Sequence, residues 1–118
     1  KIGHIGLYRD EETHEPHEYY CKLPSPISER LIVVTDPMLA TGESLELAWR
    51  AFTTKGIPAK LVIACIIASR PGVERIRKFF EGKDVSLWCG VIDPAIDEHS
   101  YIVPGLGDAG DLAYGEKI

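Results

Sequence analysis

An acidic residue that follows a buried strand and precedes a Thr-Gly turn is the clearest chemical feature of this sequence. Asp36 comes directly after the apolar segment 31–35, and residues 36–44 have the sequence Asp-Pro-Met-Leu-Ala-Thr-Gly-Glu-Ser. A carboxylate at the end of a strand can accept hydrogen bonds from sugar hydroxyls, and main-chain N–H groups at the start of a helix bind phosphate oxygens. The segment therefore predicts a sugar-phosphate site. An ordinary strand-to-helix turn, capped by Thr41 or Ser44, explains the same residues and stays open at this point.

A second candidate site lies near the C-terminus, in the glycine-rich segment 101–111. Glycine lets a backbone approach a ligand closely, and Asp108 and Asp111 could hold Mg²⁺ through water or cap a turn. Gly105, Gly107 and Gly110 match the spacing of a dinucleotide-binding motif. That motif must be followed by a helix and a second strand, and the chain ends eight residues after Gly110, so we reject the motif, which disfavours a nicotinamide-cofactor enzyme as a further alternative.

The lysines, histidines, cysteines and Arg9 point less clearly to a particular kind of site. No lysine follows Gly42, which excludes a P-loop, and the four histidines follow no zinc-binding pattern, so we predict no metal site made by the protein itself. The three cysteines lie among apolar neighbours and are expected to be reduced thiols. Arg9, at the end of a strand-like segment, is either a solvated charge or a bidentate clamp for pyrophosphate.

Composition predicts one domain over residues 1–118. The 118 residues include 45% apolar and 26% charged residues, within the globular range. The net charge of -5 argues against a nucleic-acid partner. No apolar run approaches the length of a membrane span and no signal peptide is recognisable, so we expect a cytoplasmic location and no membrane partner. Because the chain begins at Lys1 inside a strand-like run, we expect the domain to lack its N-terminal part.

The periodicity of the chain predicts how these residues are positioned. An N-terminal hairpin is followed by strands and helices in alternation, and Leu45, Ala48, Trp49 and Phe52 form one helical stripe that Gly56 should end. Two such crossovers predict a doubly wound α/β fold with a mostly parallel sheet and a glycine-rich C-terminal loop. Ligands bind beyond the carboxyl ends of such strands, so both candidate loops should lie there. The expected strands are 2–8, 17–23, 31–35, 61–68 and 85–92, and a second helix from residue 70 should stop at Gly82.

Taken together, these residues resemble the uracil phosphoribosyltransferase family. The matching segments are Gly3–Arg9, Tyr19–Pro24, Asp36–Gly42 and Tyr101–Asp111, in family order along the whole chain. The Asp-Pro-Met-Leu-Ala-Thr-Gly sequence is highly specific to this family. The resemblance implies a type I phosphoribosyltransferase-like fold, and the chain corresponds to the C-terminal portion of a family member.

The resemblance also implies a reaction of pyrimidine salvage, in which uracil and phosphoribosyl pyrophosphate (PRPP) give UMP and pyrophosphate. Mg²⁺ would be bound mainly through PRPP, GTP is an effector of some family members, and a homodimer or homotetramer is expected. Asp36 and Asp108 would be the catalytic residues. The resemblance assigns PRPP to Arg9, Asp36, Pro37, Met38, Leu39, Ala40, Thr41, Gly42, Glu43, Ser44 and Asp108. It assigns uracil to Ile102, Gly107, Asp108 and Ala109.

Some residues depart from the family pattern. Glu43 replaces a glycine and would repel an incoming phosphate unless it points outward, so Glu43→Gly should tighten PRPP binding. Leu112 replaces a basic residue, and family members are nearly twice as long as this chain. These departures favour the alternative, a non-catalytic nucleotide- or PRPP-binding regulatory protein on the same scaffold.

Overall fold

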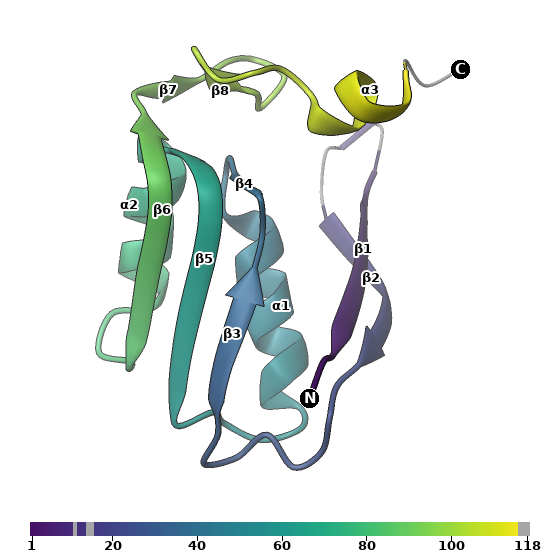
Figure 1. Cartoon of the computed structure of the whole chain (residues 1–118), viewed down its shortest axis with the longest axis vertical. Helices are drawn as coiled ribbons and strands as arrows, with labels where there is room; N and C mark the ends of the chain where they lie inside the picture. The colour runs from purple at the N-terminus through teal and green to yellow at the C-terminus, as the bar shows by residue number, and fades with distance from the viewer. Residues whose placement is uncertain (11, 14–15, 116–118) are drawn as a thin grey trace.

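A parallel β-sheet forms the centre of the protein. The computed structural model describes residues 1–10, 12–13 and 16–115. In it β3 (Leu31–Thr35), β5 (Lys60–Ser69) and β6 (Val85–Asp93) run parallel in the order β3–β5–β6 (Figure 1). A two-residue strand, β4 (Met38–Leu39), pairs with the far end of β5. The predicted strands and the α/β class are confirmed, and β4 was not expected.

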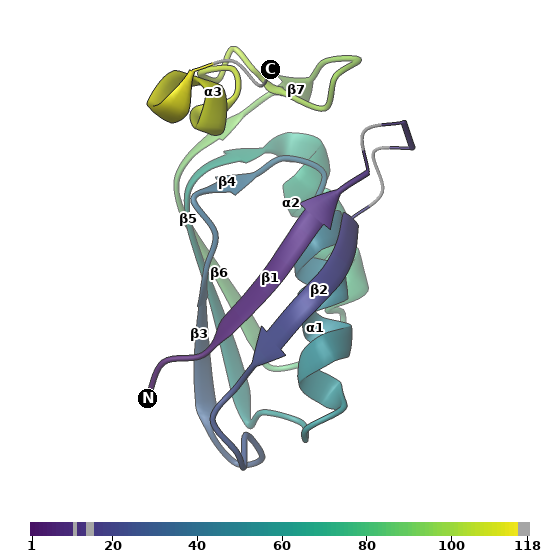
Figure 2. The same ribbon diagram turned by 90° about the vertical axis from the view of Figure 1, so that its right-hand side faces the viewer.

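Two helices cover one face of this sheet. α1 (Glu43–Thr53) connects β3 to β5, and α2 (Arg70–Phe79) connects β5 to β6. Both lie on the same side of the sheet in Figures 1 and 2. Two right-handed crossovers that proceed in the same direction along a sheet place both helices on one face. A doubly wound fold has helices on both faces of its sheet. The described residues place helices on one face only, so this part of the fold prediction is not met.

The core lies between these helices and the sheet. The predicted stripe of α1 is confirmed, with Leu45, Ala48 and Phe52 buried and Trp49 packed against the core. The helix ends are corrected. α1 ends at Thr53 rather than at Gly56, because the Lys55 N–H already turns back to the Phe52 carbonyl oxygen at 2.8 Å. α2 ends likewise at Phe79, before Gly82. The remaining buried core residues are mainly Leu61, Ile63, Cys65, Ala68, Ile76 and Phe80.

The opposite face of the sheet is apolar and exposed. Leu31 and Val33 of β3, Ile66 of β5 and Trp88 of β6 are between 56% and 71% exposed. They come from three neighbouring strands, in which Val33 lies beside Val62 and Ala64 lies beside Trp88. A contiguous apolar patch of this kind is typical of a surface that another polypeptide segment covers.

An antiparallel hairpin lies beside the sheet on the β3 side (Figure 2). It consists of β1 (His4–Arg9) and β2 (Pro16–Lys22), as predicted. Ile5 of β1 packs against the core together with Leu23, and β2 contacts α1. The hairpin is therefore joined to the α1 side of the molecule.

The C-terminal segment crosses the carboxyl end of the sheet (Figure 1). β7 (Ala95–Ile96) and β8 (Ile102–Val103) pair there and are followed by α3 (Ala109–Tyr114). Gly110 thus lies in a short helix, whereas we expected no helix at this position. The described residues hold no strand after α3. Each helix of the described chain is too short or too polar to cross a membrane.

Candidate functional site at the carboxyl end of the sheet

Asp36 is fixed at the end of β3 by its own main chain. Its N–H donates to the Ala64 carbonyl oxygen of β5 at 3.0 Å, which continues the sheet by one residue. The Asp36 carboxylate accepts a hydrogen bond from the Met38 N–H at 3.2 Å. Burial raises the pKa of the Asp36 carboxyl above its ordinary value, and the Met38 hydrogen bond lowers it in part. A half-buried carboxylate with unused acceptor capacity suits the hydroxyls of a ribose.

The residues after Asp36 are held against β5. The Pro37 carbonyl oxygen accepts from the N–H groups of Ile66 and Ile67 at 3.1 and 3.2 Å. Leu39 is 1% exposed and its side chain belongs to the core.

The first turn of α1 offers free main-chain donors. Gly42 precedes the helix with a φ of +85°, and a Cβ there would lie 3.1 Å from the Ile76 side chain. No side chain caps the helix, and the Thr41 hydroxyl only accepts a long 3.4 Å bond from the Glu43 N–H. Of the two expected caps, Ser44 accepts no such bond in the described residues, and Thr41 contributes only this long one. In the described part of the chain, the N–H groups of Ser44 and Leu45 meet no acceptor.

Ser69 and Gly72 of the next crossover also shape this loop, and we did not predict them. The buried Ser69 hydroxyl donates to the Ala40 carbonyl oxygen at 2.5 Å and accepts from the Gly72 N–H at 2.9 Å. A Cβ on Gly72 would lie 2.2 Å from the Ala40 oxygen. The sequence Ser-Arg-Pro-Gly does indicate a helix N-terminus. It does not indicate that the same hydroxyl holds a loop that is distant in the sequence.

The side chain of Glu43 forms an ion pair with α2. Arg75 Nη1 lies 2.8 Å from Glu43 Oε1, and Arg75 Nε lies 2.5 Å from Glu46 Oε1. These contacts raise the pKa of the Arg75 guanidinium, chiefly through the hydrogen bond to Glu46. The carboxylate that the sequence places beside the phosphate site is thus compensated by a nearby positive charge.

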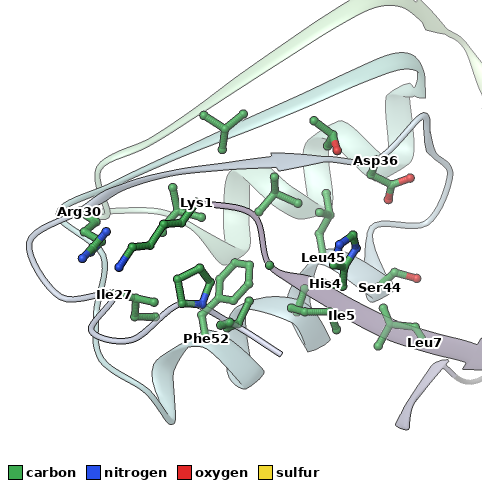
Figure 3. A pocket seen from close by; sticks show the side chains of 18 of the residues that line it. Lys1, His4, Ile5, Leu7, Ile27, Arg30, Asp36, Ser44, Leu45 and Phe52 are labelled. Carbon is green, nitrogen blue, oxygen red and sulfur yellow. The ribbon is translucent and has the colours of Figure 1, made fainter. Parts of the chain in front are cut away.

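A cavity of about 710 Å³ opens between the hairpin, β3 and α1. Asp36 and Ser44 line one end of it, near His4, and Ile27, Arg30 and Phe52 lie toward the other end (Figure 3). Its lining is mixed, and the cationic side chains of Lys1 and Arg30 lie toward the end away from Asp36 (Figure 3). The Asp36 carboxylate and Ser44 lie together at the end of the cavity that adjoins the 36–44 loop.

The C-terminal loop lies at the same end of the sheet, as predicted (Figure 1). Asp108 caps α3, because its Oδ1 accepts from the Asp111 N–H at 2.9 Å. Gly107 has a φ of +79°, and a Cβ there would meet no atom within 4 Å, so its main chain is open to a ligand. Ile102, in contrast, is only 1% exposed as a whole residue, main chain included. Ala109 is exposed at the start of α3.

Two further expectations concern the Arg9 side chain and the binding of Mg²⁺. The backbone of Arg9 ends β1 opposite Pro16, and its side chain, on which the pyrophosphate role depends, lies outside the described residues. For Mg²⁺, no cluster of three or more His, Cys, Asp or Glu side chains occurs within the described ranges. Asp111 Oδ1 is a buried carboxylate oxygen without a partner among the described residues, where the Asp36 carboxylate accepts one hydrogen bond, from the Met38 N–H. Such single carboxylates fit Mg²⁺ that is held mainly by the phosphates of its ligand.

A strand-end carboxylate and free N–H groups of a helix, on a parallel α/β sheet, form an arrangement suited to a sugar phosphate. The comparisons with known proteins name the family. A family model described as uracil phosphoribosyltransferase matches residues 1–116, and the chain belongs to this family.

Individual relatives are named for the same family. The chain is 48% identical over 117 residues to a uracil phosphoribosyltransferase of Alkaliphilus metalliredigens and 50% identical to one of an Exiguobacterium species. Each alignment covers 99% of this chain and 54% of the relative, so the chain spans about half the length of these relatives. The solved structure of the AQ2163 protein from Aquifex aeolicus is 39% identical, with a TM-score of 0.88, over 100% of this chain and 55% of that one.

Proposed function

We propose that this chain provides the PRPP- and uracil-binding part of a uracil phosphoribosyltransferase, which forms UMP and pyrophosphate from uracil and PRPP. One observation carries the proposal. Asp36, at the end of β3, and Ser44, at the start of α1, line the same end of the cavity, and the Ser44 and Leu45 N–H groups meet no acceptor in the described residues, in a chain of this family. A single pentose phosphate can use both features at once.

The loop would divide its contacts along PRPP. Asp36 accepts hydrogen bonds from the ribose hydroxyls, and the N–H groups between Thr41 and Ser44 hold the 5′-phosphate. Arg9, at the end of β1, would bind the pyrophosphate as a bidentate donor. The buried Ser69 hydroxyl supports this arrangement, since it fixes the Ala40 carbonyl and with it the course of the loop.

Uracil would be recognised by main-chain groups of the C-terminal loop, at Ile102, Gly107 and Ala109, with Asp108 facing both substrates. Uracil presents two carbonyls and an N–H along one edge, which paired backbone groups can match. The exocyclic amino group of cytosine would leave such donors unpaired, at about 1–3 kcal/mol each. The open backbone at Gly107 suits this form of recognition.

Catalysis would consist of positioning and charge stabilisation. The bond from the ribose to pyrophosphate breaks, positive charge builds on the ribose ring, and the uracil nitrogen forms the new bond. Asp36 and Asp108 would be the carboxylates that stabilise that charge. Mg²⁺, when bound with PRPP, would neutralise charge on the departing pyrophosphate.

A non-catalytic PRPP-binding regulatory protein is the second candidate. It is favoured by Glu43 in the phosphate loop and by Leu112, which is 71% exposed on α3 where a basic residue is usual in the family. A GTP effector and a homodimer or homotetramer are further parts of the proposal, and the exposed apolar face of the sheet favours self-association.

The two candidates differ in turnover. Purified full-length protein is incubated with uracil, PRPP and Mg²⁺, UMP is measured by chromatography, and PRPP binding is measured by calorimetry. UMP formation with uracil, and none with cytosine, is the expected result. PRPP binding without UMP would favour the regulatory candidate, and absence of both would refute the proposed site. Sedimentation of the same sample reports its oligomeric state.

A further inference from the structure

One arginine of α2 joins the two acidic residues at the start of α1. Arg75 contacts Glu46 through two atoms, with Nε at 2.5 Å and Nη2 at 3.3 Å from its two carboxylate oxygens. This leaves Nη1 for Glu43, at 2.8 Å. Glu46 is the most buried of the three, with 15% of its side chain exposed, against 32% for Glu43 and 42% for Arg75. The fork to Glu46 therefore fixes the guanidinium so that its remaining edge faces Glu43.

Glu43 has a particular reason to need a partner. It is the first residue of α1, and the Ser44 and Leu45 N–H groups beside it have no acceptor in the described chain. Negative charge is stabilised near the positive end of a helix dipole. A carboxylate that is not held elsewhere can therefore turn toward these donors and act as an intramolecular competitor of a phosphate group.

We propose that Arg75 is a positioning residue that holds the Glu43 carboxylate away from the phosphate-binding N–H groups of α1. This inference rests on the proposed function, since it assumes that the 36–44 loop binds the 5′-phosphate of PRPP. It assigns Arg75 no contact with the substrate. The helix that carries Arg75 also packs closely against this loop. A Cβ at position 42 would lie 3.1 Å from the Ile76 side chain and 3.4 Å from the Gly72 carbonyl oxygen, both of α2.

The inference predicts how substitutions combine. Arg75→Ala should weaken PRPP binding about fivefold, as expected for one partly screened charge interaction, while the KM for uracil changes less than twofold. Arg75→Lys should recover part of the loss, since a single ammonium cannot hold both carboxylates as the planar fork does. In a Glu43→Gly background, Arg75→Ala should change the affinity for PRPP less than twofold, because no carboxylate remains to be held back.

The test uses calorimetry of PRPP binding to the full-length protein and its variants, with steady-state KM values for both substrates. Arg77→Ala is the matched control, since Arg77 is an exposed arginine of the same helix without an ion pair among the described residues. Circular dichroism shows whether each variant is folded. If Arg75→Ala does not fold, the comparison of Arg75→Lys with wild type, in both backgrounds, provides the same cycle.

Each outcome decides the question. A fivefold loss that disappears in the Glu43→Gly background supports the inference. An equal loss in both backgrounds shows that Arg75 acts on the phosphate directly, and no loss beyond that of Arg77→Ala shows that the ion pair is only structural. Both results overturn the inference and leave the proposed function standing. If the wild-type protein does not bind PRPP, the proposed function and this inference fail together.

Discussion

Removal of the Ser69 hydroxyl tests whether the start of α2 holds the 36–44 loop in place. Ser69 is completely buried and joins three segments, because it ends β5, caps α2 through the Gly72 N–H, and donates to the Ala40 carbonyl oxygen. In Ser69→Ala the helix cap is lost, at about 1 kcal/mol, and the Ala40 oxygen loses the hydroxyl that donates to it, at about 1–3 kcal/mol. We therefore expect the free energy of unfolding to fall by about 2–4 kcal/mol.

Urea denaturation, followed by circular dichroism, measures this change. A domain of this size is stabilised by about 5–15 kcal/mol, so the variant should remain folded, with an unchanged denaturant slope and a lower midpoint. The KM for PRPP should rise as well, since Ala40 is part of the 36–44 loop, whereas the KM for uracil should change little.

Ser86→Ala is the control. Ser86 lies on β6, and its hydroxyl makes no hydrogen bond within the described residues, so its loss should change stability by less than about 0.5 kcal/mol. If Ser69→Ala were as stable as Ser86→Ala, the bridge between α2 and the loop would contribute nothing, and the reasoning would be refuted.

Two further predictions concern charge. Asp36→Asn keeps an oxygen that can accept from the Met38 N–H but removes the negative charge. The affinity for PRPP should therefore fall tenfold or more, about the strength of one charged hydrogen bond. The free energy of unfolding at neutral pH should stay equal or rise, because burial disfavours the ionised carboxyl. Calorimetry and urea denaturation check this, and unchanged affinity would exclude Asp36 from the ribose site. For Cys65, burial raises the pKa of the thiol from 9.0 to about 11. The unfolded chain therefore loses this proton at lower pH than the folded chain, so the thiol's contribution to stability is complete below pH 9 and is lost as the pH rises toward 11. Cys65→Ala should show a smaller fall in stability over this pH range than wild type, and an equal fall would contradict the assignment.

Part of the fold could be read from local patterns. The strands at 31–35 and 85–92 follow from their apolar runs, the stripe of α1 follows from periodicity, and the alternation of strands and helices predicts the parallel sheet. The expected burial of strand 31–35 on both faces is wrong, because in the described residues no helix covers its second face. The helix ends were less predictable, because a turn hydrogen bond such as Lys55 N–H to Phe52 ends α1 before the glycine is reached. β4 was missed because its two residues gain strand geometry only by pairing with β5.

The sequence by itself determined the chemistry at the candidate site, since the residue types and their order from Asp36 to Ser44 supply a carboxylate and a helix start that a sugar phosphate can use. Only the tertiary structure decided which residues support that site. Ser69 lies 29 positions from Ala40, and Arg75 lies 32 positions from Glu43, and the crossover of α2 onto the same face of the sheet as α1 brings each pair together. A contact between distant segments depends on how the elements pack, and packing is set by the whole core rather than by the residues that meet.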